Sequence, residues 1–314
     1  MAVTTGELRS ILSVSDLSAS ELDSLVKRSA VLKKQMRARK PPSTLAGKVV
    51  GLLFEKPSTR TRTSFEVATI RLGGDPVYLS AGELQLSRGE PVRDTARILG
   101  GYLDAIVGRV YSQETLSELA RYSGRPVVNA LSDTEHPTQI ISDLLTISEV
   151  KGKLKGLTTA YIGDGNNVSN SLLLGGALTG MNVLVACPEG YEPDSKIYKA
   201  ARSIARKTGA DIATVRDPKE ALANADVVYT DVWVSMGEES EKEKKTRAFK
   251  GYQINAALMK SAPKSAVVMH CLPAHRGLEI TDDVIEGKQS VVWQEGENKL
   301  YGAAASLEFI CGAH

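Results

Sequence analysis

We expect an α/β protein with two doubly wound domains, each a mostly parallel sheet flanked by helices, and a cleft between the domains. Short apolar runs of strand length alternate with segments of helical periodicity along the chain. This alternation is typical of a mostly parallel sheet, whose crossover connections are usually helices. The 314 residues exceed what one hydrophobic core usually supports, and this length predicts two domains.

The first domain is expected to span residues 1–150. It begins with a helix after Ser18, because Ser18 and Glu21 have the spacing of a capping box and apolar residues follow at helical intervals. The apolar runs that predict its strands are Val49–Phe54, Ala105–Val110 and Val127–Ala130.

The second domain is expected to span residues 151–296. The polar stretch Lys151–Gly156 interrupts the pattern, and a new alternating series follows it. We expect the last segment, from about residue 297 to residue 314, to form a helix that packs back on the first domain. The strands of the second domain are predicted at Thr158–Ile162, Val183–Ala186, Ile212–Val215, Val227–Thr230 and Ala266–Met269.

Charge and cysteine content exclude several classes of protein. The 39 basic residues nearly balance 37 acidic ones, so no broad positive surface for nucleic acid or an anionic membrane is expected. Three cysteines without a Cys-x-x-Cys pair argue against a disulfide framework or a thiolate metal site. The first residues lack an apolar signal core, and no apolar run approaches membrane-spanning length. We therefore expect a cytoplasmic protein.

Four adjacent side chains suited to an anion follow the first predicted strand: Ser58, Thr59, Arg60 and Thr61. They open a predicted helix, whose first turn offers backbone N–H groups and the positive end of the helix dipole. Each residue taken singly is better explained as a helix cap or a solvated side chain. Together they predict a site for a phosphate group. The Gly-x-x-x-x-Gly-Lys-[Ser/Thr] loop of nucleoside triphosphatases is missing from the sequence.

These residues belong to a set of motifs that spans nearly the whole chain. The set resembles, in identity and order, the aspartate/ornithine carbamoyltransferase superfamily. The resemblance implies transfer of a carbamoyl group from carbamoyl phosphate without a metal or an organic cofactor. The cysteine of the last motif implies ornithine as acceptor, because aspartate enzymes typically have His-Pro-Leu-Pro there. The motifs are Ser58-Thr-Arg-Thr-Arg62, Asp94-Thr-Ala-Arg97, His136-Pro-Thr-Gln139, Asp231-Val-Trp-Val-Ser-Met-Gly237 and His270-Cys-Leu-Pro273.

The resemblance implies that one group of residues binds carbamoyl phosphate. Within it, Thr61, Arg109, His136 and Gln139 hold the carbonyl oxygen, where negative charge grows during attack. Arg109 and His136 stand at or just after predicted strand ends, where doubly wound folds bind ligands. Arg109 alone is as easily explained as an exposed strand end, and a lone histidine is more often packed or solvated than catalytic. The implied set is Ser58, Thr59, Arg60, Thr61, Gln85, Arg109, His136, Gln139, Cys271, Leu272 and Lys299.

The same resemblance places ornithine in the second domain. Asp231 is expected to bind the α-ammonium, and Cys271 to position the δ-amine and handle its proton. The densely charged segment Glu238–Lys250 follows Gly237 and predicts either a closing lid or a solvated surface. The implied ornithine set is Asn167, Asp231, Ser235, Met236, Cys271 and Leu272, and the implied catalytic set is Arg109, His136, Cys271 and Asp231.

One departure from the family pattern and two alternatives stay open. Lys299 stands where the family usually has an arginine; lysine keeps the charge but loses the planar fork. The acceptor could be another amine such as putrescine. A NAD-dependent oxidoreductase built on Gly163-Asp-Gly165 is weaker, because Val168 occupies the third glycine position of the fingerprint. The resemblance also implies small-molecule substrates and a homotrimer or an assembly of trimers.

Overall fold

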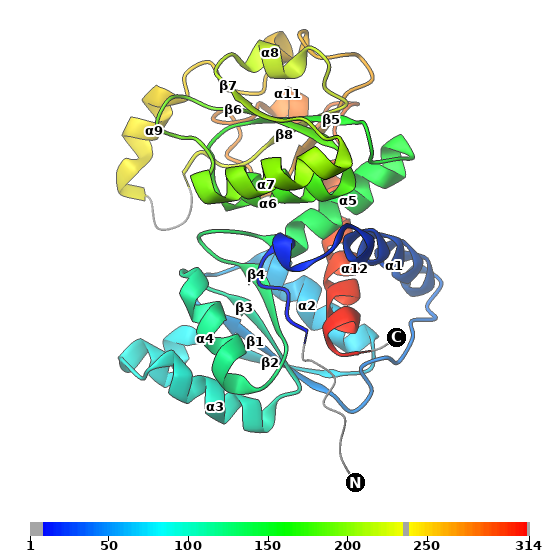
Figure 1. Ribbon diagram of the computed structural model, residues 1–314, viewed down its shortest axis with the longest axis vertical. Helices are drawn as coiled ribbons and strands as arrows, with labels where there is room; N and C mark the ends of the chain where they lie inside the picture. Colours follow the sequence, from blue (N-terminus) through cyan, green and yellow to red (C-terminus); the bar gives the residue numbers. More distant parts are fainter. Residues whose placement is uncertain (1–8, 235–238, 313–314) are drawn as a thin grey trace. The chain divides into compact units, whose positions relative to one another are not determined.

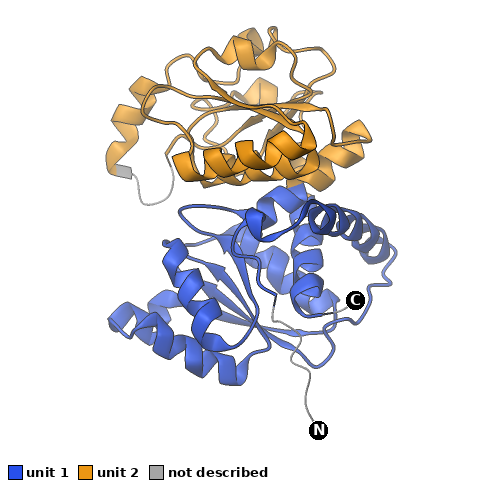
Figure 2. Ribbon diagram, in the orientation of Figure 1, with its two compact units in different colours: residues 1–142, 298–314 blue, residues 143–297 orange. Residues whose placement is uncertain are grey.

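The computed structural model describes residues 9–234 and 239–312, which form two compact units (Figure 2). Unit 1 comprises residues 1–142 and 298–314, and unit 2 comprises residues 143–297. We expected a boundary near residue 150. The chain instead passes from unit 1 to unit 2 within helix α5 (Pro137–Lys151) and returns within helix α12 (Val292–Ile310).

Unit 1 contains a four-stranded parallel sheet in the order β2-β1-β3-β4. Its strands β1 and β3 are buried along almost their whole length, as parallel strands covered on both faces should be. Residues near Ile11 extend the sheet beside β4 through a bridge to Val128. The strands are β1 (Val49–Phe54), β2 (Asp75–Ser80), β3 (Ala105–Arg109) and β4 (Val127–Leu131).

The helices of unit 1 cover both faces of this sheet (Figure 1). α3 and α4 pack on one face through a cluster that includes Leu99, Leu116 and Leu119. α2 lies on the other face, as right-handed crossovers require when the chain runs first from β1 to β2 and then back to β3. The helices are α1 (Ala19–Arg37), α2 (Thr59–Arg71), α3 (Val92–Tyr102) and α4 (Gln113–Ser123), with short 3-10 turns η1 (Val14–Asp16), η2 (Ala81–Glu83) and η3 (Gln85–Arg88).

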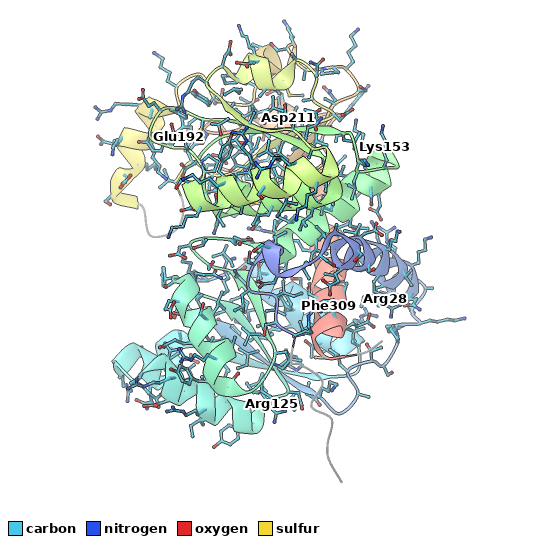
Figure 3. All side chains as sticks on the ribbon, viewed as in Figure 1. Arg28, Arg125, Lys153, Glu192, Asp211 and Phe309 are labelled. Atoms are coloured by element: carbon cyan, nitrogen blue, oxygen red, sulfur yellow. The ribbon has the colours of Figure 1, made fainter. Side chains whose placement is uncertain are left out.

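The end of the chain returns to unit 1 and is fixed there by a buried carboxylate. Arg28 on α1 points toward α12 (Figure 3) and donates two hydrogen bonds to Glu308, at 2.6 and 2.9 Å. The hydroxyl of Thr44 donates to the same carboxylate at 2.8 Å. Gly302 of α12 lies so close to Ser142 that an added Cβ would come within 2.4 Å of the serine Oγ. Residues 298–310 therefore belong structurally to the first half of the chain.

Unit 2 contains a five-stranded parallel sheet in the order β7-β6-β5-β8-β9. As in unit 1, the strand order reverses in the middle, between β5 and β8. Such a reversal leaves a crevice beyond the carboxyl ends of the two central strands, where doubly wound folds bind ligands. The strands are β5 (Thr158–Ile162), β6 (Asn182–Ala186), β7 (Ile212–Val215), β8 (Val227–Thr230) and β9 (Val267–His270).

The helices of unit 2 also form two layers (Figure 1). α6 and α7 pack together on one face, and α8, α10 and α11 share a core with Ala160, Val228 and Val268 on the other. No helix in residues 9–234 and 239–312 is long and apolar enough to cross a membrane. The remaining helices are α6 (Asn167–Thr179), α7 (Ser195–Thr208), α8 (Pro218–Leu222), α9 (Lys242–Ala248), α10 (Ala256–Met259) and α11 (Asp282–Ile285), with η4 (Glu239–Glu241) before α9.

Candidate active site

The start of α2 lies at the carboxyl end of β1, directly beside the end of β3. Ser58 caps this helix: its hydroxyl accepts a hydrogen bond from the N–H of Thr61 at 3.1 Å. The first N–H groups of any helix lack intrahelical acceptors and attract anions. Thr59 is exposed, Arg60 is partly buried and Thr61 is buried, so the four predicted residues line a helix start that is open to a ligand on one side.

Arg109 ends β3, and Phe54 of β1 lies opposite it in the register of the sheet. The side chain is only 6% exposed, although arginine is rarely buried. The sheet is irregular at this point, because the register with β4 shifts between Gly108 and Arg109. The guanidinium therefore lies at the carboxyl end of the sheet, where α2 also starts.

His136 and Gln139 come from the loop after β4 and the first turn of α5, and both are buried. The ammonium of Lys299 on α12 donates a hydrogen bond to Oε1 of Gln139. Burial lowers the pKa of His136 well below its ordinary value, and the positive charges of Lys299 and Arg109 lower it further. Because protonation would place a third positive charge there, His136 is a neutral imidazole at neutral pH and a donor through one nitrogen only.

We expect the ring nitrogens of His136 to keep a neutral NMR signature as the pH falls from 8 through 6, because the folded protein holds its pKa below the ordinary value. Nitrogen-15 spectra of the protein labelled at histidine, assigned by comparison with His136→Asn, test this. A midpoint near ~6.5, the ordinary histidine value, would contradict the electrostatic description of the site.

Among the residues of the first set that belong to unit 1, Gln85 lies apart from the start of α2 and from Arg109 in its hydrogen bonding. It is exposed on η3, and no hydrogen bond within residues 9–234 and 239–312 links its side chain to the start of α2 or to Arg109. Lys56, which sequence reasoning missed, is only 8% exposed just before α2, with its ammonium 4.6 Å from the centre of the Tyr111 ring. It adds a positive charge close to the predicted phosphate site.

The second group of predicted residues lies at the reversal point of the unit 2 sheet. Asp231 follows β8, and Cys271 follows the neighbouring strand β9. The thiol of Cys271 donates to Oδ1 of Asp231 at 3.0 Å, and the amide of Asn166 donates to Oδ2 at 2.8 Å. Asp231 is 6% exposed and Cys271 is 8% exposed. A buried carboxylate held in this way suits a positively charged ligand group.

Asn167 is the first residue of α6 and is partly buried. Its neighbour Asn166 is the cap of the helix, and it is Asn166 that contacts Asp231. Ser235 and Met236 lie outside the described residues. Of the charged segment after them, Lys245 is buried and forms an ion pair with Asp164 at 2.6 Å, so that part of the segment is not simply solvated.

The turn at Cys271 and Leu272 is shaped by a fully buried histidine and glutamate. Nδ1 of His270 accepts a hydrogen bond from the N–H of Leu272 at 2.9 Å, so the ring proton is on Nε2, which donates to Oε1 of Glu279 at 3.2 Å. Leu272 has a φ of 58°, in the left-handed region that a leucine seldom adopts. The histidine stabilises this conformation and thereby positions the adjacent thiol.

Asp231, His270 and Cys271 have ligand atoms within 4.8 Å of one another, as a metal site would. His270, however, cannot serve as a ligand to a metal ion. One of its nitrogens already accepts from Leu272 and the other carries the proton that Glu279 accepts, so the neutral ring has no lone pair left for a metal. The two remaining groups are too few for a stable structural or catalytic site.

The Gly163-Asp-Gly165 turn is explained by packing within the protein. A Cβ on Gly165 would come within 2.2 Å of the backbone of Glu192, so only glycine fits beside this loop. Asp164 of the same turn is engaged by Lys245. This use of the turn removes the main support for a dinucleotide site.

Comparison with known proteins shows that both halves of the chain match domains of one family. Residues 9–149 match the domain described as "Aspartate/ornithine carbamoyltransferase, carbamoyl-P binding domain", and residues 155–310 match the "Asp/Orn binding domain" of the same family. The chain belongs to the aspartate/ornithine carbamoyltransferase family. The family resemblance inferred from the motifs is therefore confirmed.

Relatives in this family match over nearly their whole length. The chain is 50% identical to an ornithine carbamoyltransferase from Methanosarcina mazei over 299 residues, which are 95% of this chain and 98% of the relative. The solved ornithine carbamoyltransferase of Pyrococcus furiosus is 46% identical, with a TM-score of 0.94 over 98% of both chains. That of Gloeobacter violaceus is 47% identical, with a TM-score of 0.85 over 95% of this chain and 96% of that one. The predicted fold class is confirmed.

Proposed function

We propose that the chain is an ornithine carbamoyltransferase, which converts carbamoyl phosphate and L-ornithine to L-citrulline and phosphate. The observation that supports ornithine over aspartate is the buried Asp231 carboxylate, which accepts from the Cys271 thiol at 3.0 Å. An uncharged thiol and a carboxylate suit a substrate with amino groups. A second substrate carboxylate would be repelled there.

Carbamoyl phosphate is bound by the group of residues in unit 1. Its phosphate takes hydrogen bonds from the start of α2, with the hydroxyls of Ser58, Thr59 and Thr61 and the guanidinium of Arg60. Its carbonyl oxygen takes hydrogen bonds from Thr61, Arg109, His136 and Gln139. The ammonium of Lys299 replaces the family's usual arginine. It acts through Gln139, whose carbonyl oxygen it already holds.

Ornithine is bound by the group of residues in unit 2. Asp231 pairs with the α-ammonium, and Asn167 contacts the amino-acid end, together with Ser235 and Met236. Cys271 and the backbone of Leu272 lie at the δ-amine and also reach the carbamoyl group. We further propose that Gln85 completes the carbamoyl-phosphate site of a neighbouring subunit, which explains its exposure in the single chain.

The neutral δ-amine attacks the carbonyl carbon, a carbon–nitrogen bond forms, and the carbonyl oxygen gains negative charge. We assign Arg109 and the neutral His136 as catalytic donors to that oxygen, because both side chains are held by burial and would need little reorganisation. The bond to the phosphate oxygen then breaks, and phosphate leaves on the start of α2. The amine proton departs by way of Cys271 and Asp231, which are already hydrogen-bonded to each other.

Formation of the carbamoylated amine and release of phosphate from carbamoyl phosphate, measured with ornithine, putrescine and aspartate in parallel, test this function. Ornithine should be the preferred acceptor by kcat/KM, because only it offers both an α-ammonium and a terminal amine. The rate should rise with pH toward the pKa of the amine, near ~10.4 by analogy with lysine. A preference for putrescine or aspartate, or a rate that stays flat in alkali, would reject the proposal.

We also propose that the enzyme is a cytoplasmic homotrimer or an assembly of trimers. Ile70 and Val77 on α2 and the edge strand β2 are 60% and 40% exposed, which suits burial against another subunit. Light scattering of the purified chain measures the mass of the assembly.

A further inference from the structure

We propose that Asn166 is a positioning residue for ornithine, acting through Asp231. This inference rests on the proposed function, since Asp231 is assigned to the α-ammonium of ornithine. Asn166 itself is expected to make no contact with the substrate. Its function is to hold the Asp231 carboxylate in one orientation through a single amide donor.

The amide of Asn166 is fixed by four hydrogen bonds. Its Oδ1 accepts from the N–H groups of Val168 and Ser169 at 3.0 and 3.1 Å, which caps α6, and from the hydroxyl of Tyr161 at 3.2 Å. All three partners are donors, so the oxygen must face them and Nδ2 must face Asp231, which it reaches at 2.8 Å. The start of α6 thus sets the direction of the donor.

Asp231 is in turn held at both carboxylate oxygens, by Asn166 on Oδ2 and by Cys271 on Oδ1. A carboxylate has about four acceptor positions, so each oxygen keeps capacity for a ligand ammonium. Asn166 adds no charge, so it orients the carboxylate without neutralising it. A lysine or an arginine at this position would neutralise the carboxylate. Loss of the amide donor leaves Asp231 with the weaker thiol donor of Cys271 on Oδ1, so the carboxylate can rotate more easily.

The test is Asn166→Ser, with Asn255→Ser as the matched control. Serine also caps helices well, but its hydroxyl is too short to bridge to Asp231. Asn255 is another asparagine cap in unit 2, and its Oδ1 accepts from the N–H of Leu258 at 2.9 Å. A second variant, Asn166→Thr, also keeps a capping hydroxyl and also lacks the N–H donor, and it adds no charge beside Asp231.

We expect both Asn166 variants to raise KM for ornithine about tenfold or more, as loss of a hydrogen bond to a charged group predicts. The inhibition constant of L-norvaline, which has the α-amino acid end but no δ-amine, should rise by the same factor. KM for carbamoyl phosphate and the melting temperature should match those of Asn255→Ser. A KM for ornithine within twofold of the wild type in both variants would overturn the inference.

A second readout does not depend on turnover. Because a fixed carboxylate beside the thiol disfavours the thiolate, iodoacetamide should alkylate Cys271 several-fold faster in Asn166→Ser than in the wild type or in Asn255→Ser, as measured by peptide mass spectrometry. Equal rates would argue against positioning. If the wild type formed no citrulline, the proposed function would fail, and the alkylation rates would still decide whether Asn166 holds Asp231.

Discussion

Replacing Arg60 by alanine is expected to lower kcat/KM for carbamoyl phosphate by about a hundredfold to a thousandfold, the loss typical when one preorganised donor to a developing charge is removed. The guanidinium stands in the first turn of α2, where it adds a full charge to the dipole and the N–H groups of the helix start. Steady-state kinetics with varied carbamoyl phosphate at saturating ornithine measure the effect.

Two variants control for general damage at α2. Arg71→Ala removes an exposed arginine from the last turn of the same helix and should leave the kinetics unchanged. Arg60→Lys should restore only part of the lost activity, because an ammonium lacks the planar fork that binds two phosphate oxygens. Kinetics of Arg60→Ala that equal those of Arg71→Ala would remove the helix start from the mechanism.

Replacing Asp231 by asparagine is expected to raise KM for ornithine about a hundredfold, since the α-ammonium loses a charge-assisted hydrogen bond. The substitution preserves the size of the side chain, so the packing around it should change little. It also places an amide opposite Asn166, whose Nδ2 now faces the carboxylate. The KM for carbamoyl phosphate should stay close to that of the wild type.

The control for this prediction is Asp217→Asn. Asp217 caps α8, where its Oδ1 accepts from the N–H of Lys219 at 2.9 Å, and asparagine caps a helix equally well. This variant should bind ornithine normally. An unchanged KM for ornithine in Asp231→Asn would show that the α-ammonium binds elsewhere.

The strands of both sheets could be predicted from the sequence because most are buried on both faces. Apolar runs marked β1, β5, β7 and β8 to the residue, and the ends of the other predicted strands to within one residue. β2 was missed, because Asp75–Ser80 contains a proline and lies at the sheet edge with alternating exposure. Its pattern is therefore too polar to stand out from a loop.

The boundary between the two units was harder to predict from the sequence. The polar stretch after residue 150 marks the end of helix α5, but the units divide at residue 142 inside that helix. The apolar periodicity of α5 continues without a break across this point, since both parts of the helix are buried. A boundary inside a continuous helix leaves no composition signal.

The site residues that directly follow a strand could be predicted from the sequence. Asp231 and Cys271 each follow an apolar run directly, and the structure joins them by a hydrogen bond. The roles of Asn166 and Asn167 could not be separated, because adjacent asparagines at a helix start look alike until the donors around them are known. Glu279 was missed for a similar reason: its partner His270 lies nine residues away, across a turn.

The most direct test of the two-site account is a crystal structure of the protein with carbamoyl phosphate and L-norvaline, which cannot react because it lacks the δ-amine. We predict the phosphate on the N–H groups at the start of α2, with Arg60 and Arg109 turned toward the ligand, and the α-ammonium on the carboxylate of Asp231. Clear density for either ligand at another location, with these residues in contact with solvent only, would contradict the account.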